Sequence, residues 1–236
     1  MKPMPSVSRV TKAAERFIPP FENGDRMDQK TFHALYMQTP DGFKAELIGG
    51  IVYVASPVSG FHSVPNSVTG TWLGVYAAET LGTQACTDSS AILSEESEPQ
   101  PDQCLRITEV AGGQSQWDAR RYLSGAPELA VEISNSSAGI DLHAKLRDYE
   151  QYGVREYLVV VMRQHEVHWF VRRKDRFTPM KPGADGVLKS KVFPGLWLDT
   201  AGVFDETATR LLATLRKGLA SPEHAKFVAK LSKKVN

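Results

Sequence analysis

The sequence predicts an α/β protein in which a mixed central sheet is flanked by helices. Two apolar runs, at 129–133 and 156–162, predict buried strands, because strands covered on both faces are almost continuously apolar. Segments with helical apolar spacing lie before, between and after the predicted strands. This alternation is typical of one mixed sheet covered by helices. A chain of 236 residues is long enough for one domain with a sizeable core.

Three segments are expected along the chain. Residues 1–25 are rich in proline and charge and predict a loosely ordered N-terminal arm, residues 26–205 predict the α/β domain, and residues 206–236 predict a basic helical tail. The formal net charge of +1 excludes nucleic-acid binding through overall positive charge, so any such binding requires local patches. No run approaches the roughly 18 apolar residues of a membrane span, and we expect a cytoplasmic protein with no membrane partner.

The pattern predicts the elements in a definite order. They are a helix at about 29–38, hairpin arms at 43–48 and 51–55, a helix at about 61–81, a strand at about 83–93, an acidic turn at 94–100, a strand at 104–110, a surface loop at 111–125, the strand at 129–133, a helix at 141–152, strands at 156–162, 167–171 and 192–198, and a helical tail from 207.

Local signals support the first elements. Asp28 is suited to cap the first helix. Gly49-Gly50 between two apolar runs is a strong signal for a β-hairpin, whose second arm ends at Ser56-Pro57. The next helix has Pro65 in its first turn and ends before Gly82. Its expected apolar stripe consists of Val64, Val68, Trp72, Val75 and Leu81.

Local signals also support the later elements. The helix at 141–152 has Leu142, Leu146 and Tyr149 as packed positions, and Gly153 ends it. The segment 167–171 is the simplest hairpin partner for the apolar strand before it. The tail has leucines at helical spacing, which are Leu211, Leu212, Leu215 and Leu219.

Several classes of site are disfavoured. Cys86 and Cys104 lie in separate apolar stretches without zinc spacing, and two reduced thiols are favoured over a disulfide. The histidines show no HExxH pattern, so a zinc hydrolase is weakly supported. The chain contains no P-loop, no GxGxxG that opens a helix and no GxSxG.

Three acidic residues form the candidate site. Glu46 lies in the first hairpin arm, Asp102 just before a strand, and Glu132 inside an apolar strand, where a carboxylate is unfavourable unless it is paired or binds a metal. Asp102 and Glu132 at one end of a sheet would offer the oxygen ligands that Mg²⁺ or Mn²⁺ prefers. Ser134 occupies the position of the lysine in an Asp…Glu-X-Lys pattern, and Lys145 in the next helix is the candidate to reach back over the strand end.

Each of these residues also has an ordinary structural interpretation. Asp102 suits a turn, and Glu46 suits the solvent face of a hairpin. Lys145 stands four positions after Asp141, the spacing of a solvated helix pair. His62 is more often a residue at a helix start than a catalyst.

The candidate residues lie within longer motifs. In chain order these are Ala45 to Val52 around Glu46 and Gly49-Gly50, Ser56-Pro57 with His62, Pro101-Asp102, Pro127 to Ser134 around Glu132, and Asp141, Lys145 and Tyr149 followed by Gly153 to Tyr157. This series resembles the Uma family of restriction-endonuclease-like proteins, over about residues 28–200 and most specifically over 126–160. That family resembles the PD-(D/E)XK nuclease superfamily, which implies a restriction-endonuclease-like α/β core with a Mg²⁺ site.

The resemblance also implies roles. Asp102 and Glu132, with the carbonyl of Ile133, would hold Mg²⁺ or Mn²⁺. Lys145 would replace the lysine of the superfamily, and Glu46 matches the acidic residue of the first hairpin. The implied activity is a metal-dependent endonuclease that hydrolyses DNA phosphodiester bonds, and a homodimer is expected by analogy.

A second hypothesis follows from departures at Ser134-Asn135 and Val161. It is a nuclease-fold protein with weak or no catalysis that acts as a nucleic-acid-binding or interaction module. Under the first hypothesis, phosphate contacts are expected from basic segments that are equally well explained as solvated surface. These segments are Arg172-Arg173-Lys174 with Arg176, and the tail residues Arg216, Lys217, Lys226, Lys230, Lys233 and Lys234.

Overall fold

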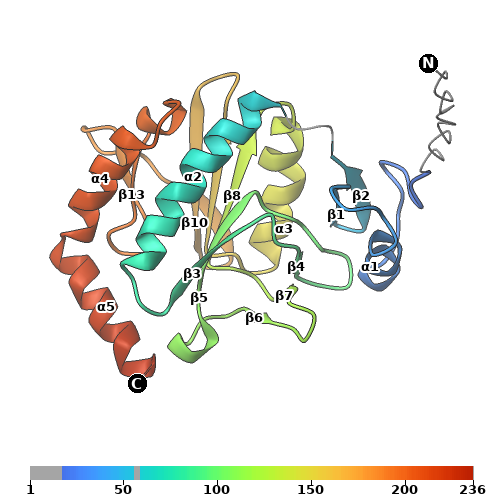
Figure 1. Cartoon of the computed structure of the whole chain (residues 1–236), viewed down its shortest axis with the longest axis horizontal. Helices are drawn as coiled ribbons and strands as arrows, with labels where there is room; N and C mark the ends of the chain where they lie inside the picture. Colours follow the sequence, from blue (N-terminus) through green and yellow to red (C-terminus); the bar gives the residue numbers. More distant parts are fainter. Residues whose placement is uncertain (1–17, 56–58, 236) are drawn as a thin grey trace, which may run out of the picture.

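A six-stranded mixed sheet lies at the centre of the computed structural model, which describes residues 18–55 and 59–235 (Figure 1). The strands, in order across the sheet, are β11 (Arg176–Pro179), β10 (Glu166–Arg173), β9 (Glu156–Val161), β8 (Leu129–Ser134), β5 (Gln103–Ile107) and β3 (Thr83–Thr87). Strands β8 and β9 are parallel, and the other neighbouring pairs are antiparallel. The predicted α/β class with a mixed central sheet is confirmed.

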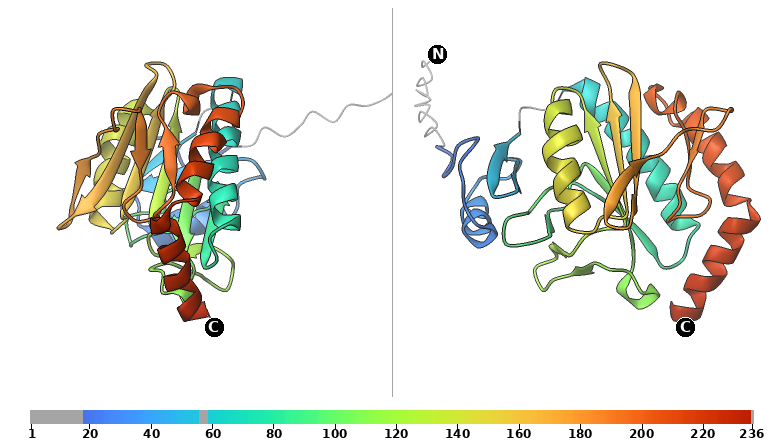
Figure 2. Two further views of the ribbon diagram at one scale, coloured as in Figure 1. Left: turned by 90° about the vertical axis from the view of Figure 1, so that its left-hand side faces the viewer. Right: turned by 180° about the vertical axis from the view of Figure 1, so that it is seen from behind.

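Helices cover both faces of this sheet (Figure 2). Helices α2 (Gly60–Ala78) and α4 (Thr209–Leu219) pack on one face. A π-helix, η2 (Ile140–Lys145), continues into α3 (Leu146–Gln151) on the other face. Each side chain of the sheet therefore packs either against α2 and α4 or against η2 and α3, depending on the face to which it points.

Strand β8 alternates between the two faces, as a pleated strand must. Leu129, Val131 and Ile133 join the core under α2, whereas Ala130 joins the core under α3. Glu132 therefore points toward η2 and α3, and the strand itself is buried along its whole length.

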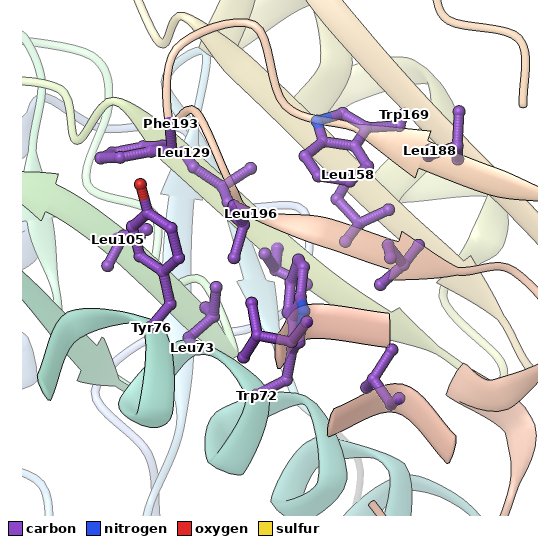
Figure 3. Packing of buried hydrophobic residues seen from close by; sticks show 14 of the residues in the cluster. Trp72, Leu73, Tyr76, Leu105, Leu129, Leu158, Trp169, Leu188, Phe193 and Leu196 are labelled. Carbon is purple, nitrogen blue, oxygen red and sulfur yellow. The ribbon is translucent and has the colours of Figure 1, made fainter. Parts of the chain in front are cut away.

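The larger core lies between α2 and the sheet (Figure 3). Trp72 and Tyr76 of α2 are fully buried, and the Trp72 ring packs edge-on against Trp169 of β10, with ring centroids 6.1 Å apart. Phe193 and Leu196, from the segment before β13 (Trp197–Asp199), fill the remaining space. This packing holds α2 firmly and so positions the residues at its start.

Smaller elements surround the main sheet. They are α1 (Gln29–Tyr36), the hairpin of β1 (Ala45–Ile48) and β2 (Ile51–Val54), a three-stranded sheet of β4 (Ala91–Ile92), β7 (Leu123–Ser124) and β6 (Gln116–Trp117), the pair β12 (Val187–Lys189) and β13 (Trp197–Asp199), the 3₁₀ turns η1 (Glu109–Ala111) and η3 (Gly202–Phe204), and α5 (Pro222–Val235). In Figure 1 the β1–β2 hairpin and α1 lie together at one side of the sheet.

Several local predictions are confirmed. Asp28 caps α1 by accepting a hydrogen bond from the backbone N–H of Thr31 (2.9 Å). Gly49 and Gly50 both have positive φ, which a two-residue hairpin turn of this kind requires. The strand 167–171 pairs with β9 as expected.

Cys86 and Cys104 are both free and face each other across β3 and β5.

Other local predictions are wrong. The strand expected at 83–93 divides into β3 and β4, because Asp88 has positive φ (50°) and turns the chain between them. The strand expected at 104–110 ends at Ile107, and η1 follows. The surface loop expected at 111–125 contains β6 and β7 and buries Leu123. It is drawn inward because buried Arg106 bonds to Ser115.

The later part of the chain also differs from the prediction in detail. The helix expected at 141–152 begins as the π-helix η2. The last strand starts at Trp197, not at Val192, because the preceding backbone turns to bond to Glu156. Val64 of α2 is exposed, and so is Leu81, which lies beyond the end of α2 at Ala78, so neither belongs to the packed stripe.

The two ends of the described chain pack against the rest of the protein. Phe21, within the arm expected to be loosely ordered, is buried and stacks on Phe32. The tail consists of two helices, and Leu215 and Leu231 join the main core. Residues 1–17 and Ser56-Pro57 lie outside the described residues. Within the part of the chain that is described, no helix is long and apolar enough to cross a membrane.

Candidate acidic site

The pairing of β5 with β8 brings two predicted residues together. Gln103 pairs with Val131 in antiparallel register, so one further step places Asp102 opposite Glu132. The Asp102 carboxylate accepts a hydrogen bond from the backbone N–H of Ile133 at 2.7 Å. The expected convergence of these two carboxylates at one end of the sheet is confirmed, although they are thirty positions apart in the sequence (132 − 102).

Glu132 is buried, with 3% of its surface exposed. One carboxylate oxygen, Oε1, accepts hydrogen bonds from the Lys145 ammonium and the Tyr149 hydroxyl, both at 3.0 Å. Among the described residues, no hydrogen bond reaches the other oxygen, Oε2. Glu132 lines an acidic hollow of about 260 Å³, and we define this hollow by Glu46, Asp102, Glu132, Asp141 and Lys145.

Lys145 lies at the centre of the acidic residues. Its ammonium is 2.8 Å from Glu46, 3.0 Å from Glu132 and 3.9 Å from Asp141. The π-helix carries Asp141 and Lys145 on the side that faces β8, and both are buried. The solvated pair with Asp141 is therefore not what the structure contains, and the lysine instead reaches back over the strand end.

Glu46 reaches the site from the hairpin. The backbone N–H of Gln100 donates to Glu46 Oε1 at 2.6 Å, and Leu47 forms an isolated β-bridge with Glu98. These bonds attach the hairpin to the segment that leads into Asp102. Four residues that the resemblance marked, Glu46, Asp102, Glu132 and Lys145, are thus gathered at one place.

His62, at the start of α2, also belongs to the site. Its Nε2 lies 3.1 and 3.2 Å from the two oxygens of Asp102. Its Nδ1 is buried without a hydrogen-bond partner in the described structure. The sequence left His62 as an ordinary helix-start residue, and only packing of α2 on the sheet shows that it touches the site.

Burial and charge act in opposite directions on the ionisable groups. Burial alone would lower the pKa of Lys145, but Glu132, Glu46 and Asp141 outweigh it and raise this pKa well above its usual value. Burial raises the pKa of Glu132 despite Lys145, and neighbouring carboxylates add to the rise. Lys145 keeps its proton, since three carboxylates surround its ammonium.

Asp102 behaves differently from Glu132. Burial would raise its pKa, but the hydrogen bond and charge of His62, with the N–H of Ile133, lower it. The hydrogen bond to Asp102 in turn raises the pKa of His62. The site therefore contains an ionised carboxylate, that of Asp102, next to the acidic hollow. It also contains more acidic side chains than basic ones.

The donor set fits a hard divalent cation. Within the described ranges, no group of three or more His, Cys, Asp and Glu side chains is arranged to hold a metal ion. Mg²⁺, however, is commonly held by one or two carboxylates, with waters completing its shell. Asp102, Glu132 and Ile133 line the same hollow, and the surplus of carboxylates around one ammonium favours a bound cation.

The predicted basic segments do not lie at this site. The hairpin of Arg172 to Arg176 follows Val171, which pairs with Glu156 at the start of β9, the far end of the sheet from Glu132. Two of its arginines are paired, with Asp175 and with Glu150. Helix α5 lies at the end of the molecule opposite the start of α2 (Figures 1 and 2).

Sequence reasoning also missed the contacts that two residues make at this site. Tyr149 was expected only to pack, yet its hydroxyl holds Glu132. Asp141 was expected to be solvated, but it is buried and bonded to the Ser137 hydroxyl at 2.6 Å. The spacing of Asp141, Lys145 and Tyr149, four positions apart on one helical face, was the available signal.

Comparison with known proteins agrees with the motifs. The model of the Uma2 family, described as "Putative restriction endonuclease", matches residues 30–201. A crystal structure from Anabaena variabilis, described as "a putative nuclease belonging to DUF820", is similar with a TM-score of 0.54, 12% sequence identity, and coverage of 77% of this chain and 97% of that chain. At this identity the likeness shows the fold alone. No curated protein matches the sequence.

Proposed function

Because the chain belongs to the Uma2 family, we propose that it is a metal-dependent endonuclease that hydrolyses phosphodiester bonds of DNA. The observation that carries the proposal is the contact of Lys145 with Glu132 beside Asp102, at the edge of the acidic hollow. Two carboxylates and an ammonium at one strand end are the groups that metal-assisted phosphodiester hydrolysis uses.

Asp102, Glu132 and the carbonyl of Ile133 would hold Mg²⁺ or Mn²⁺. When bound, such a cation lowers the pKa of a water molecule and offsets charge on the phosphate. Tyr149 and Lys145 occupy Oε1 of Glu132, which leaves Oε2 for the hollow. Glu46 likewise has one oxygen, Oε2, without a hydrogen bond among the described contacts, and it would order a water.

Lys145 acts in this proposal through its charge. Because the surrounding carboxylates keep the ammonium protonated, it serves to position the attacking water and to stabilise negative charge that develops on the phosphate. It does not serve as the base. His62 holds Asp102 in place through the carboxylate.

The test is nicking of supercoiled plasmid DNA by the purified protein with Mg²⁺ or Mn²⁺. We expect cleavage by the native protein, and a loss of about 10³-fold or more in Asp102→Ala and in Glu132→Ala, since loss of a metal ligand removes several kcal/mol of transition-state stabilisation. Glu156→Gln is the matched control, because Glu156 is an equally buried glutamate in the next strand that does not line the hollow.

Calorimetric titration with Mn²⁺ gives an independent measurement. The native protein and Glu156→Gln should bind Mn²⁺, and the Asp102 and Glu132 variants should not. A native protein that binds no Mn²⁺ and cuts no DNA would overturn the proposal.

One observation favours the second function, a nuclease-fold module that binds nucleic acid without cleaving it. Lys145 is bonded directly to Glu132 and Glu46, so the cation that these carboxylates contact is the protein's own ammonium. The module hypothesis predicts binding of DNA that is independent of divalent cations and no nicking in the same assay.

A further inference from the structure

We infer that a second hollow beside the acidic one binds an unpaired nucleobase of the DNA strand being cut. We call it the aromatic hollow and define it by Tyr36, Gln100, Trp117, Arg121 and Tyr122. Its volume is about 470 Å³, within the range of about 300–1,000 Å³ of small-molecule sites. The inference rests on the proposed function, since it specifies which form of the substrate that function would use.

The aromatic rings of this hollow are fixed by partners of their own. Tyr36 stacks on buried Phe32 with ring centroids 5.5 Å apart, and Tyr122 packs edge-on against His33 at 4.6 Å. Rings that are already ordered lose little conformational freedom when a ligand binds, which favours binding of a flat aromatic group.

Trp117 is fixed in the same way. Its indole N–H donates to the Gln84 side chain at 2.9 Å, and the buried guanidinium of Arg106 lies 5.6 Å from its ring centroid. The side chain is still partly exposed toward the aromatic hollow. Partly exposed aromatic rings are the surfaces on which proteins stack the bases of single strands.

Arg121 supplies a cation at the same place. Its guanidinium lies 5.0 Å from the Trp117 ring centroid, the side chain is exposed, and no ion pair with a carboxylate is formed among the residues that the structure describes. Its backbone is held in the left-handed region (φ 68°) by the turn after Asp118. Guanidinium planes stack on bases and also contact phosphates.

The aromatic hollow adjoins the acidic hollow through shared residues. Gln100 lines both, and its backbone N–H donates to Glu46. Asp88 also lines both, and its N–H donates to the carbonyl of Asp102 at 3.2 Å. A phosphate at the acidic hollow would therefore have a neighbouring nucleotide within reach of the aromatic rings.

The geometry selects an unpaired base. In a duplex, bases are stacked and paired, so a base enters a side hollow only from a single strand or after it has flipped out. The hydrogen-bonding groups that line the hollow include the Gln100 amide and the Ser90 hydroxyl, which lie 3.4 Å apart. They suit the polar edge of a base, and the rings suit its faces.

The experiment compares two single-stranded probes of equal charge, a thymidine dodecamer and a dodecamer of abasic sugar-phosphates. Affinity is measured by fluorescence anisotropy with Ca²⁺ in place of Mg²⁺, so that no cleavage is needed. We expect the native protein to bind the thymidine probe about tenfold more tightly or better, since each stacked base contributes about 1–3 kcal/mol. In Trp117→Ala and Arg121→Ala this ratio should fall toward one.

Arg173→Ala is the matched control, because Arg173 is exposed on the β10–β11 hairpin and, in the described structure, also forms no ion pair. Because this hairpin lies at the far end of the sheet from the acidic hollow, the change should leave the affinity for both probes, and hence their ratio, unchanged. Trp117→Phe keeps an aromatic ring and should keep most of the difference in affinity between the two probes, which separates loss of stacking from damage to the fold. Arg121 is exposed, so Arg121→Ala should have little effect on the fold.

A ratio of one in the native protein, or an unchanged ratio in both Trp117→Ala and Arg121→Ala, would overturn the inference. Failure of the proposed nuclease activity would be seen separately, as absence of nicking with Mg²⁺ or Mn²⁺, whatever the probe ratio is.

Discussion

Two buried glutamates in neighbouring parallel strands differ in every contact they make. Glu132 lies near the end of β8 and Glu156 at the start of β9, so they stand at opposite ends of the same sheet and on opposite faces. Both have 3% or less of their surface exposed. Glu132 is bonded to an ammonium and a phenol hydroxyl, whereas Glu156 accepts bonds from the backbone N–H groups of Lys191 and Val192 and from the Ser190 hydroxyl.

The difference lies in the oxygens that remain without a partner. Both oxygens of Glu156 are occupied, and the turn at 190–193 closes over it. Glu132 has one oxygen without a hydrogen bond in the described structure, and it lines a hollow. A buried carboxylate alone thus does not indicate a functional site. The indication comes from a carboxylate oxygen that has no hydrogen-bond partner and faces a hollow, because natural structures rarely leave buried polar groups unpaired.

The largest effect that would separate the two regions is expected from Lys145→Ala. It leaves Glu132 and Asp141 buried and Glu46 half-buried without their cation, and should lower the free energy of unfolding by about 3–5 kcal/mol. Lys191→Ala is the control, since Lys191 is exposed and holds Glu156 only through its backbone. Urea unfolding measures both. A loss below about 1 kcal/mol for Lys145→Ala would show that the carboxylates around Glu132 do not depend on this ammonium, which would contradict the comparison.

A second effect concerns pH. Burial raises the pKa of Glu156 to about 7 from the usual 4.5. The folded state thus favours the protonated form, so this contribution to stability is full below pH 4.5 and is lost as pH rises through about 7. At 1.36 kcal/mol per pKa unit the loss is about 3 kcal/mol. Glu156→Gln should lack this loss of stability with rising pH.

This prediction is checked by urea unfolding between pH 5 and 8 for both proteins. The difference in stability between Glu156→Gln and the native protein should shift in favour of the variant as pH rises. A difference that stays constant over this range would show that Glu156 does not titrate there.

A third effect sharpens the comparison through metal binding, and rests on the proposed function. At a Mn²⁺ concentration 100 times the dissociation constant, the native protein should gain about 2.7 kcal/mol of stability. Glu156→Gln should gain the same, and Glu132→Gln and Asp102→Asn should gain nothing. Thermal unfolding with and without Mn²⁺ measures this. An equal gain in Glu132→Gln would place the metal elsewhere.

The smallest effect compares two buried tyrosines of the same core. Tyr149 donates to Glu132, and Tyr157 donates to the backbone carbonyl of Asp141, both at 3.0 Å. Replacement of either by Phe should cost about 1 kcal/mol of stability. Only Tyr149→Phe should also weaken Mn²⁺ binding, because it removes a hydrogen bond that holds the Glu132 carboxylate in its orientation. Calorimetric titration checks this, and equal weakening in both variants would contradict an orienting role for Tyr149.

Local chemistry in the sequence was sufficient to predict much of the fold. The cap at Asp28 and the turn at Gly49-Gly50 depend on neighbours within a few positions, so they were predicted correctly. The apolar runs of β8 and β9 were recognised for a similar reason, since continuous burial leaves a continuous apolar pattern. The order of the acidic motifs, with the family resemblance, also placed Glu46, Asp102, Glu132 and Lys145 in one candidate site.

Only the tertiary structure decided how those residues meet. The register of β5 on β8 sets Asp102 opposite Glu132, and packing of α2 brings His62 to Asp102. Lys145 fitted two sequence interpretations, a solvated pair and a lysine that reaches back, and burial against β8 selected the second. These contacts join segments far apart in the chain, and their geometry depends on how whole strands and helices pack, which no local pattern of residues encodes.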